Sequence, residues 1–483
     1  MEKSAWVAAG LTAALVSASV GYVVLDVLDV APGMLTTQEP RAAAAPPPTL
    51  PSLAVGVNAR GQEIGPPLGA DSVAAIESAV ADFAGAQLFA RQEVTEEPAA
   101  EGGATPAPTV RVVPPAATAV LISDAVTGEV VAQHNAGQAL TPASTMKTLA
   151  GIAVLGRVGG GKRLETATLI EGQIVYLRGG GDIYLAPDAG NPYGVSGRAG
   201  LGDLARSTAA ALKAKGLSSV HLALDDTLFP ASDAFNPNWE GSEDYVGKVV
   251  PIAMNGTFEP EVGYYDDPAL AAAQTFRGHL EAAGIAVEGE LERAATPQEA
   301  VGLAAVESAP VYELVSRSLK ESNNTSTEVE CRLVAVAAGK PATFQGATEA
   351  VREFLTEVGV DTEGLVMNDC SGLSDVSKVS PRTLVSVLQV ARGSQRYPQL
   401  QLFDSALAFA SVDGTLGRRY LEDTPLLRGK TGSLSNVASL SGTLVTKSGR
   451  PLDFAIISDG FAEGGLWGAR LEIDALIYAI SEQ

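Results

Sequence analysis

The sequence predicts an α/β protein of two or more domains, and three observations lead to that class. The chain has 483 residues, of which 46% are hydrophobic, enough for more than one core. From about residue 116 onward, short apolar runs typical of strands alternate with segments whose apolar residues have helical spacing. Before that point proline, alanine and glycine dominate, so the main folded part is expected to begin late in the chain.

The first residues form an apolar segment that is long enough to cross a bilayer. Residues 5–25 carry no charge, Lys3 precedes them, and Asp26 follows. We favour an uncleaved membrane anchor within residues 1–30, and a signal peptide cleaved near residues 17–19 is the alternative. In either case the rest of the chain is expected outside the cytoplasm, at the cell surface.

Residues 31–110 have the composition of a linker. They include four alanines and three prolines in a row at 42–48, and such a stretch cannot bury a core. Within this linker, residues 72–90 have apolar side chains at helical spacing and predict one short helix, through Val73, Ile76, Val80 and Phe83.

The elements beyond the linker can be placed in order. Two apolar runs within residues 119–132, joined by a turn containing glycine, predict a strand hairpin. A helix is expected after Pro142, and residues 166–304 look like a separate α/β lobe. Further strands are expected at 174–177, 220–224, 426–431, 438–446 and 452–457, and helices at 200–215, 268–283, 310–340 and from about 466.

Ser144 and Lys147 stand three residues apart at the expected helix start. Residues at i and i+3 share a helix face, so the lysine amine can reach the serine hydroxyl. A serine needs a base beside it to act as a nucleophile, and a lysine can be that base if its pKa is lowered. Taken alone, the pair is better interpreted as a helix-capping serine beside a solvated lysine, and the rest of the chain has to decide.

Composition excludes several other kinds of function. The net charge of −23 argues against nucleic-acid binding and indicates general solubility. The three histidines, His134, His221 and His279, lack metal-ligand spacing, so neither a metal site nor a histidine-containing triad is expected. Two segments approximate a phosphate-binding loop, at 156–163 and 424–431, but each lacks a required residue.

Two more short motifs follow the Ser144 pair, and the order of the three is informative. They are Ser322-Asn323-Asn324 and Lys430-Thr431-Gly432-Ser433. Together they resemble the active site of the penicillin-recognising serine acyl-transferases, the class of penicillin-binding proteins and serine β-lactamases. Residues 116–483 resemble more narrowly the D-alanyl-D-alanine carboxypeptidase/endopeptidase family, the low-molecular-mass class C penicillin-binding proteins of peptidase family S13. Family-like phrases stand at 140–144, 179–182, 319–324, 369–374, 412–416 and 430–434.

This resemblance implies a fold and a domain arrangement. The catalytic domain would be β-lactamase/transpeptidase-like, an antiparallel sheet flanked by helices, built from residues 111–165 and 305–483. Residues 166–304 would form one or two smaller inserted domains between the first and second motifs.

The resemblance also implies a serine D-Ala-D-Ala carboxypeptidase that acts on peptidoglycan stem peptides without a cofactor, and it leaves an additional endopeptidase activity open. Ser144 would be the nucleophile and Lys147 its base, kept neutral in part by repulsion from Lys430. Ser322 and Lys430 would pass the proton to the leaving D-alanine, and penicillin would acylate the same serine. Asn324 would hydrogen-bond the amide of the substrate, and Thr431, Gly432 and Ser433 would also bind the substrate. The backbone N–H groups of Ser144 and Ser433 would form the oxyanion hole.

Two other functions remain as alternatives. A serine β-lactamase would share the motifs but turn penicillin over, and a non-catalytic penicillin- or peptidoglycan-binding module would share only the fold. The presence of every motif residue argues against the second alternative.

The sequence departs from the family pattern at the Asp369 segment. Asp375 stands where many members have an arginine suited to the carboxylate of diaminopimelate. We therefore expect a preference for stem peptides with lysine or ornithine at the third position, although Asp375 reads equally well as a solvated loop residue. Cys331 and Cys370 fall in segments that the family places near the active site, and both a disulfide and two buried thiols are open. Trp239 is expected to pack within the inserted lobe.

Overall fold

The structure, a computed structural model, describes residues 64–85, 92–95, 109–112, 116–260, 263–421, 425–462 and 464–483. All of these residues belong to one compact unit. Residues 5–25, expected to be an anchor, and the alanine- and proline-rich stretch at 42–48 lie outside the described ranges. Within the described ranges, none of the helices is both long and apolar enough to span a bilayer.

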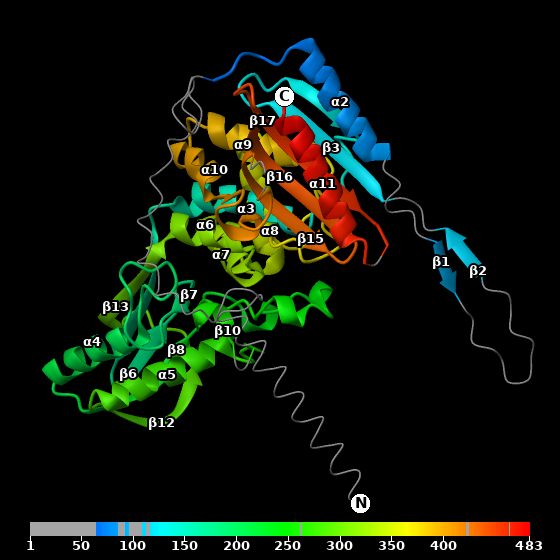
Figure 1. Ribbon diagram of the computed structural model, residues 1–483. Coiled ribbons are helices and arrows are strands. Elements are labelled where there is room, and N and C mark those ends of the chain that lie inside the picture. The colour runs from blue at the N-terminus through cyan, green and yellow to red at the C-terminus, as the bar shows by residue number, and fades with distance from the viewer. Residues whose placement is uncertain are drawn as a thin grey trace, which may run out of the picture. The chain divides into compact units, whose positions relative to one another are not determined.

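A six-stranded antiparallel sheet forms the centre of the part of the chain expected to be the catalytic domain (Figure 1). The expected hairpin at 119–132 is confirmed as β3 (Ala117–Asp124) and β4 (Val130–His134), which form one edge of this sheet. Its strands in spatial order are β14 (Ala408–Phe409), β15 (Leu426–Leu434), β16 (Val437–Val445), β17 (Pro451–Asp459), β3 (Ala117–Asp124) and β4 (Val130–His134).

Helices cover both faces of this sheet, as the burial of alternate strand residues shows. Val120 and Ile122 face a core shared with α2 (Ala70–Gly85) and α11 (Leu466–Ser481). Ala119 and Leu121 face the other core, which contains the helices of the first two motifs. Because helices cover both faces, nearly every residue of β16 and β17 is buried, polar residues included.

The helix predicted within the linker exists as α2, but it packs on the catalytic domain. Its Ile76, Val80 and Phe83 are buried against the sheet and α11. Two short strands, β1 (Gln92–Thr95) and β2 (Thr109–Val112), pair in the region expected to be linker. These strands were not predicted, because four-residue segments carry too little periodicity to separate them from their proline-rich surroundings.

The second face of the sheet is covered by a group of helices that carry the first two motifs. The stretch expected to be helical at 310–340 is two helices with a break at Ser322–Asn323. The group comprises α3 (Lys147–Val154), α6 (Val311–Glu321), α7 (Asn324–Ala337), α8 (Phe344–Val358), α9 (Pro381–Gly393) and α10 (Phe403–Ala406).

A second sheet builds the inserted domain, with strands in the order β12-β8-β6-β5-β13. Both β12 and β6 pair in parallel with β8, whereas β5 is antiparallel to β6 and β13. Helices α4 (Leu201–Ala214) and α5 (Pro268–Ala282) share its core (Figure 1). The strands are β5 (Arg163–Glu171), β6 (Ile174–Arg178), β8 (Ser219–Asp225), β12 (Ala286–Arg293) and β13 (Val301–Pro310). The expected limits of the inserted part, residues 166 and 304, stay predictions.

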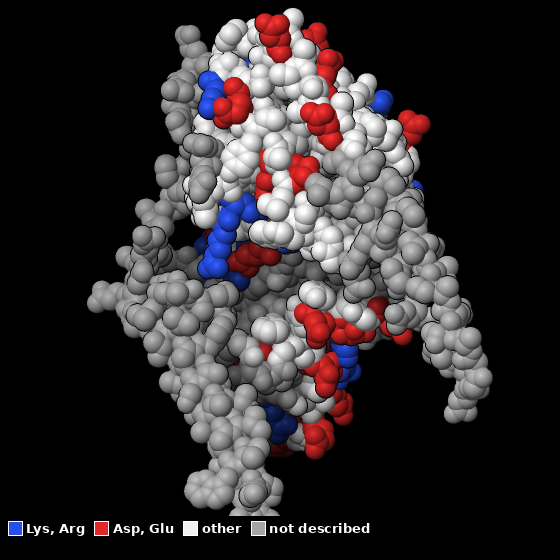
Figure 2. Space-filling model, turned by 45° about the vertical axis from the view of Figure 1, so that its right-hand side comes forward, with Lys and Arg blue, Asp and Glu red and all other residues white. Residues whose placement is uncertain are grey.

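Charged side chains are spread over the face shown in Figure 2, where acidic groups occur on much of the described surface. The sequence contains 56 acidic and 33 basic residues. A dispersed negative charge of this kind keeps a protein soluble and separates copies of it by repulsion.

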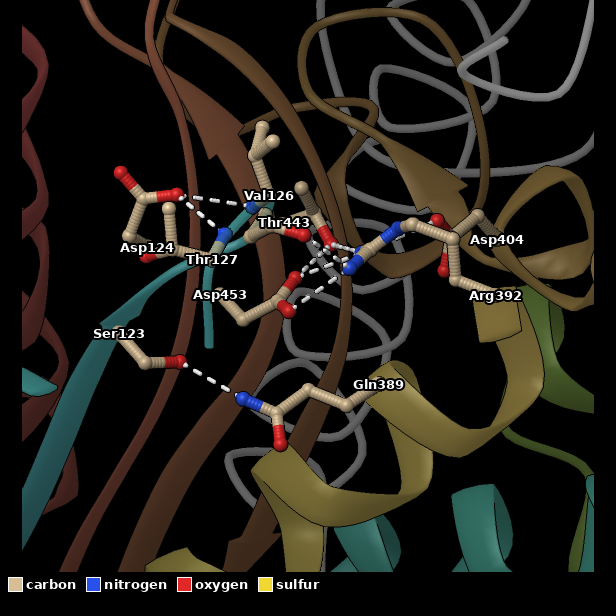
Figure 3. Close-up of polar contacts among 10 residues, drawn as sticks. Ser123, Asp124, Val126, Thr127, Gln389, Arg392, Asp404, Thr443 and Asp453 are labelled. Atoms are coloured by element: carbon tan, nitrogen blue, oxygen red, sulfur yellow. Dashed lines mark hydrogen bonds and ion pairs between the residues drawn. The ribbon is translucent and has the colours of Figure 1, made fainter. Parts of the chain in front are cut away.

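A buried ion pair fixes α9 to the central sheet (Figure 3). The Arg392 guanidinium donates to both carboxylate oxygens of Asp453, at 2.9 and 2.8 Å, and Asp453 is fully buried in β17. Such a bidentate contact offsets the free-energy cost of burying the carboxylate.

Replacing Arg392 with alanine is expected to destabilise the fold by about 3–5 kcal/mol, because Asp453 would be left buried without its partner. The control is Arg382→Ala, since Arg382 lies on the same helix but is exposed. Urea unfolding of both variants measures the difference, and equal midpoints for the two would contradict this account.

Candidate active site

Ser144 is presented by a tight turn at the start of α3. The turn is the 3-10 helix η1 (Ala143–Met146), in which Ser144 is the one residue that is not buried. Ala143 adopts a left-handed backbone conformation with φ of 49°, and the Thr145 hydroxyl donates to the Pro142 carbonyl at 2.8 Å. The turn therefore holds the serine hydroxyl outward from an otherwise buried segment.

Lys147 is fully buried and has three polar neighbours. Its Nζ lies 2.8 Å from Ser144 Oγ, 2.6 Å from Asn324 Oδ1 and 2.7 Å from the Ser371 carbonyl oxygen. A neutral amine has two N–H donors and one lone pair. Asn324 and Ser371 offer only acceptors, so they take the two N–H groups and leave the lone pair for the Ser144 hydroxyl. This is the geometry of a general base.

Burial lowers the pKa of Lys147 to about 7. The carboxyl groups of Asp369, Glu328 and Glu330 act in the opposite direction and raise it. Burial, and after it the charge of Lys147, lower the pKa of Lys430 well below 10.5, so the two amines repel each other as the sequence led us to expect.

Acylation of Ser144 is expected to speed up as the pH rises through about 7, because only the neutral amine of Lys147 can accept a proton. The rate should increase about tenfold per pH unit below that value and level off above it. Stopped-flow acylation by a chromogenic β-lactam checks this, with the thermal midpoint recorded at each pH as control. A flat profile between about pH 5 and 9 would contradict it.

The second motif lies at the break between α6 and α7. Ser322 ends α6 in a left-handed conformation with φ of 56°, and the Asn323 side chain caps α7 by accepting from the Ser326 N–H. The Lys430 amine, fully buried on β15, lies 2.9 Å from Ser322 Oγ and 2.7 Å from the Thr431 carbonyl. Ser322 and Lys430 are therefore joined as the resemblance implied.

Asn324 is engaged at both ends of its side-chain amide. Its Oδ1 accepts from Lys147, and its Nδ2 donates to the Tyr245 carbonyl of the inserted domain at 2.9 Å. The nitrogen carries two N–H groups, and Tyr245 takes one of them. The predicted contact with a substrate amide would use the other.

The third motif runs along β15 beside the Ser144 turn. A side chain at Gly432 would come within 2.2 Å of Ser439 Oγ and 2.6 Å of the Pro142 carbonyl, so glycine is required for β15 to approach the turn. Thr431 Oγ1 donates to Thr415 Oγ1 at 2.8 Å. The Ser433 hydroxyl accepts from the Arg470 guanidinium of α11, also at 2.8 Å.

The segment around Asp369 forms a rigid loop beside Lys147. The buried Asp369 carboxylate accepts hydrogen bonds from the N–H groups of Gly372 and Ser374, from the Ser377 hydroxyl and from the Trp239 indole at 2.9 Å. Trp239 packs against Phe235 of the expected inserted lobe and also connects that lobe to this loop.

The loop is also tied covalently to α7, while its outer part faces solvent. Cys331 and Cys370 form a disulfide, which decides the alternative left open by the sequence. Asp375 is exposed on this loop. No group of three or more histidine, cysteine or acidic side chains in the described ranges is placed to hold a metal ion.

Sequence reasoning missed several residues around the site: Glu328, Glu330, Thr415 and Arg470. Glu328 stands four residues after Asn324 on α7, so helical spacing was a usable signal for it. Nothing in the sequence connects Arg470 with Ser433, because α11 meets β15 only through the tertiary fold.

The antiparallel sheet flanked by helices and the three converging motifs define a serine acyl-transferase of the penicillin-binding class. The chain belongs to the D-Ala-D-Ala carboxypeptidase 3 (S13) family, whose model matches residues 112–263 and 252–476. Members of this family are serine-type D-Ala-D-Ala carboxypeptidases, and family membership gives this chain the same activity.

Similar proteins support the assignment. The chain is 32% identical over 372 residues to carboxypeptidase DacB of Mycolicibacterium smegmatis, covering 74% of this chain and 78% of the relative. It is 26% identical over 479 residues to the D-alanyl-D-alanine carboxypeptidase of Actinomadura sp. strain R39, covering 79% and 83%. The fold resembles penicillin-binding protein 4 of Haemophilus influenzae, with a TM-score of 0.59 and 21% identity over 76% of this chain and 96% of that one.

Proposed function

We propose that this carboxypeptidase cleaves the terminal D-Ala-D-Ala bond of peptidoglycan stem peptides through an acyl-enzyme on Ser144. The observation that carries the proposal is the contact of 2.8 Å between Lys147 Nζ and Ser144 Oγ, with both other neighbours of the amine being acceptors. A buried neutral amine beside a hydroxyl is what a serine nucleophile needs.

The reaction would proceed in two steps, acylation of Ser144 and hydrolysis of the acyl-enzyme. Ser144 Oγ attacks the carbonyl carbon of the penultimate D-alanine and gives its proton to Lys147, and the oxyanion binds the N–H groups of Ser144 and Ser433. The C–N bond then breaks while the proton taken by Lys147 passes to the leaving amine through Ser322 and Lys430, whose Oγ and Nζ lie 2.9 Å apart. Water attacks the resulting ester, restores the Ser144 hydroxyl and releases the shortened peptide.

The substrate would lie along β15 with its terminal carboxylate near Thr431 and Ser433. The guanidinium of Arg470, which donates to the Ser433 hydroxyl, makes this end of the strand cationic. A cross-link between two stem peptides presents the same D-alanyl bond, so endopeptidase activity fits the same machinery.

Penicillin is expected to acylate Ser144 and remain attached. Penicillin-binding protein 4 of Haemophilus influenzae, which shares this fold, has been crystallised in complex with a β-lactam. The test is incubation of the purified protein with a D-Ala-D-Ala peptide and, separately, with penicillin. Released D-alanine together with a long-lived penicillin adduct supports the proposal, rapid turnover of penicillin favours a β-lactamase, and neither product favours a binding module.

The protein is further proposed to act at the cell surface, held by residues 5–25 as a membrane anchor. The support is the absence of charge in this segment and its length. Membrane fractionation followed by mass determination of the mature protein tests this. A soluble, shortened protein would show that the segment is a cleaved signal instead.

Asp375 is proposed to select stem peptides with a cationic third residue. Its carboxylate is exposed, while the loop that carries it is fixed on either side by the Asp369 contacts of Ser374 and Ser377. An exposed ion pair contributes up to about 1 kcal/mol, which is about fivefold in specificity.

Asp375→Arg is therefore expected to change the ratio of kcat/KM for lysine over diaminopimelate peptides by about fivefold towards diaminopimelate. The matched control is Glu363→Arg, a charge reversal at another exposed position. Equal turnover of the two peptides by the unmodified protein would rule the role out.

A further inference from the structure

One face of α7 contacts the catalytic lysine and the loop beside it. Asn324, Glu328 and Cys331 are spaced at i, i+4 and i+7, which places them on one side of the helix. Asn324 accepts from Lys147, Glu328 accepts from the loop backbone, and Cys331 is bonded to Cys370. The helix therefore holds both the base and the segment that orients it.

Glu328 binds the residue whose carbonyl contacts Lys147. Its Oε1 accepts from the N–H of Cys370 at 3.0 Å and from the N–H of Ser371 at 2.7 Å. The carbonyl of the same Ser371 accepts from Lys147 Nζ at 2.7 Å. Ser371 is thus held at its amide by the carboxyl of α7 and at its carbonyl by the catalytic amine.

The two loop N–H groups depend on this carboxyl. The loop at 369–371 has no regular secondary structure, and the side chains of Glu328, Cys370 and Ser371 are all buried. Buried N–H groups without an acceptor are costly, so loss of Glu328 would make the loop rearrange. A rearranged loop would move the Ser371 carbonyl away from the lysine.

We propose that Glu328 is a positioning residue for the general base: it fixes the Ser371 carbonyl, which turns the lone pair of Lys147 towards Ser144. The inference rests on the proposed roles of Ser144 and Lys147. It assigns a function to a buried carboxyl group that the three sequence motifs do not include.

Charge is a second route by which Glu328 affects Lys147, and the two routes must be separated. The charged groups that face Glu328 are Lys147, Asp369 and Arg332. Burial and the charge of Asp369 raise the pKa of Glu328 to about 7. Glu330 also raises the pKa of Lys147, but its carboxylate accepts from Ser318 at 2.9 Å and does not contact the loop backbone.

Four variants separate the positioning role of Glu328 from the effect of its charge on Lys147. They are Glu328→Ala, Glu328→Asp, Glu328→Gln and the control Glu330→Gln. Acylation by a chromogenic β-lactam is measured between about pH 5 and 9, with the thermal midpoint of each variant. Glu328→Ala and Glu328→Asp should lower the high-pH plateau rate about 100-fold, since both withdraw the acceptor and misplace the base.

Glu328→Gln should keep the plateau rate within about threefold, because its amide oxygen can accept the same two N–H groups. Both glutamine variants should shift the acidic limb of the profile to lower pH, since each removes a carboxyl group that raises the pKa of Lys147. Glu330→Gln should leave the plateau unchanged.

Two results would overturn the positioning role. One is a plateau rate for Glu328→Asp equal to that of the unmodified protein, which stays informative if the alanine variant does not fold. The other is a glutamine variant as slow as the aspartate variant. An unmodified protein that is never acylated would refute the proposed function instead, so the two failures are distinguishable.

Discussion

Replacing Ser144 with alanine should abolish covalent labelling by penicillin and lower peptide turnover on the order of 10⁶-fold. The reason is that the acyl-enzyme needs an oxygen at this position, and Ser144 is the one half-buried member of a turn whose other residues are buried. The variant should keep its thermal midpoint, because Ser144 contributes no core packing.

The matched control for this change is Ser435→Ala, an exposed serine just beyond β15. It should leave both labelling and turnover at the level of the unmodified protein. Intact-protein mass spectrometry and a D-alanine release assay measure the two quantities. A penicillin adduct on the Ser144→Ala protein would show that another nucleophile does the chemistry.

The second large effect is expected at Lys147. Lys147→Met keeps the length of the side chain in its buried site but removes the amine, and acylation should slow about 10⁴-fold. The pH dependence near 7 should disappear with it, because that dependence belongs to the amine of Lys147. The rate constant for β-lactam acylation, recorded over the same pH range as for the unmodified protein, is the measurement.

Lys340→Ala is the control for this substitution. Lys340 lies beyond the end of α7, away from the motifs, and forms an ion pair with Glu353. It should leave the rate and its pH profile unchanged. If the methionine variant were acylated at a comparable rate, the base would have to be sought elsewhere.

Much of the site could be predicted from the sequence because its residues are fixed by short local patterns. The pair Ser144 and Lys147 needs only the spacing of one helical turn, and the strand expected at 426–431 contains Lys430. The resemblance supplied their order. The fold of the catalytic domain also followed from the resemblance, whereas local patterns predicted single elements such as the closing helix from about residue 466.

The remainder depends on contacts between segments that are distant in sequence. The bond between Asn324 and the Tyr245 carbonyl and that between Trp239 and Asp369 both join the inserted domain to the catalytic one. Helix α2 was predicted as a helix, but its partners α11 and β4 could not be read from its own residues. Tertiary packing decides such contacts, and one sequence does not reveal it.

The most direct test of the central claim is peptide mapping of the protein after brief incubation with a β-lactam. If Ser144 is the nucleophile, a single adduct is expected, on Ser144 within the peptide that also contains Lys147. The yield at short times is also expected to rise as the pH increases through about 7. A modification on any other residue, or an equal yield at every pH, would contradict the claim.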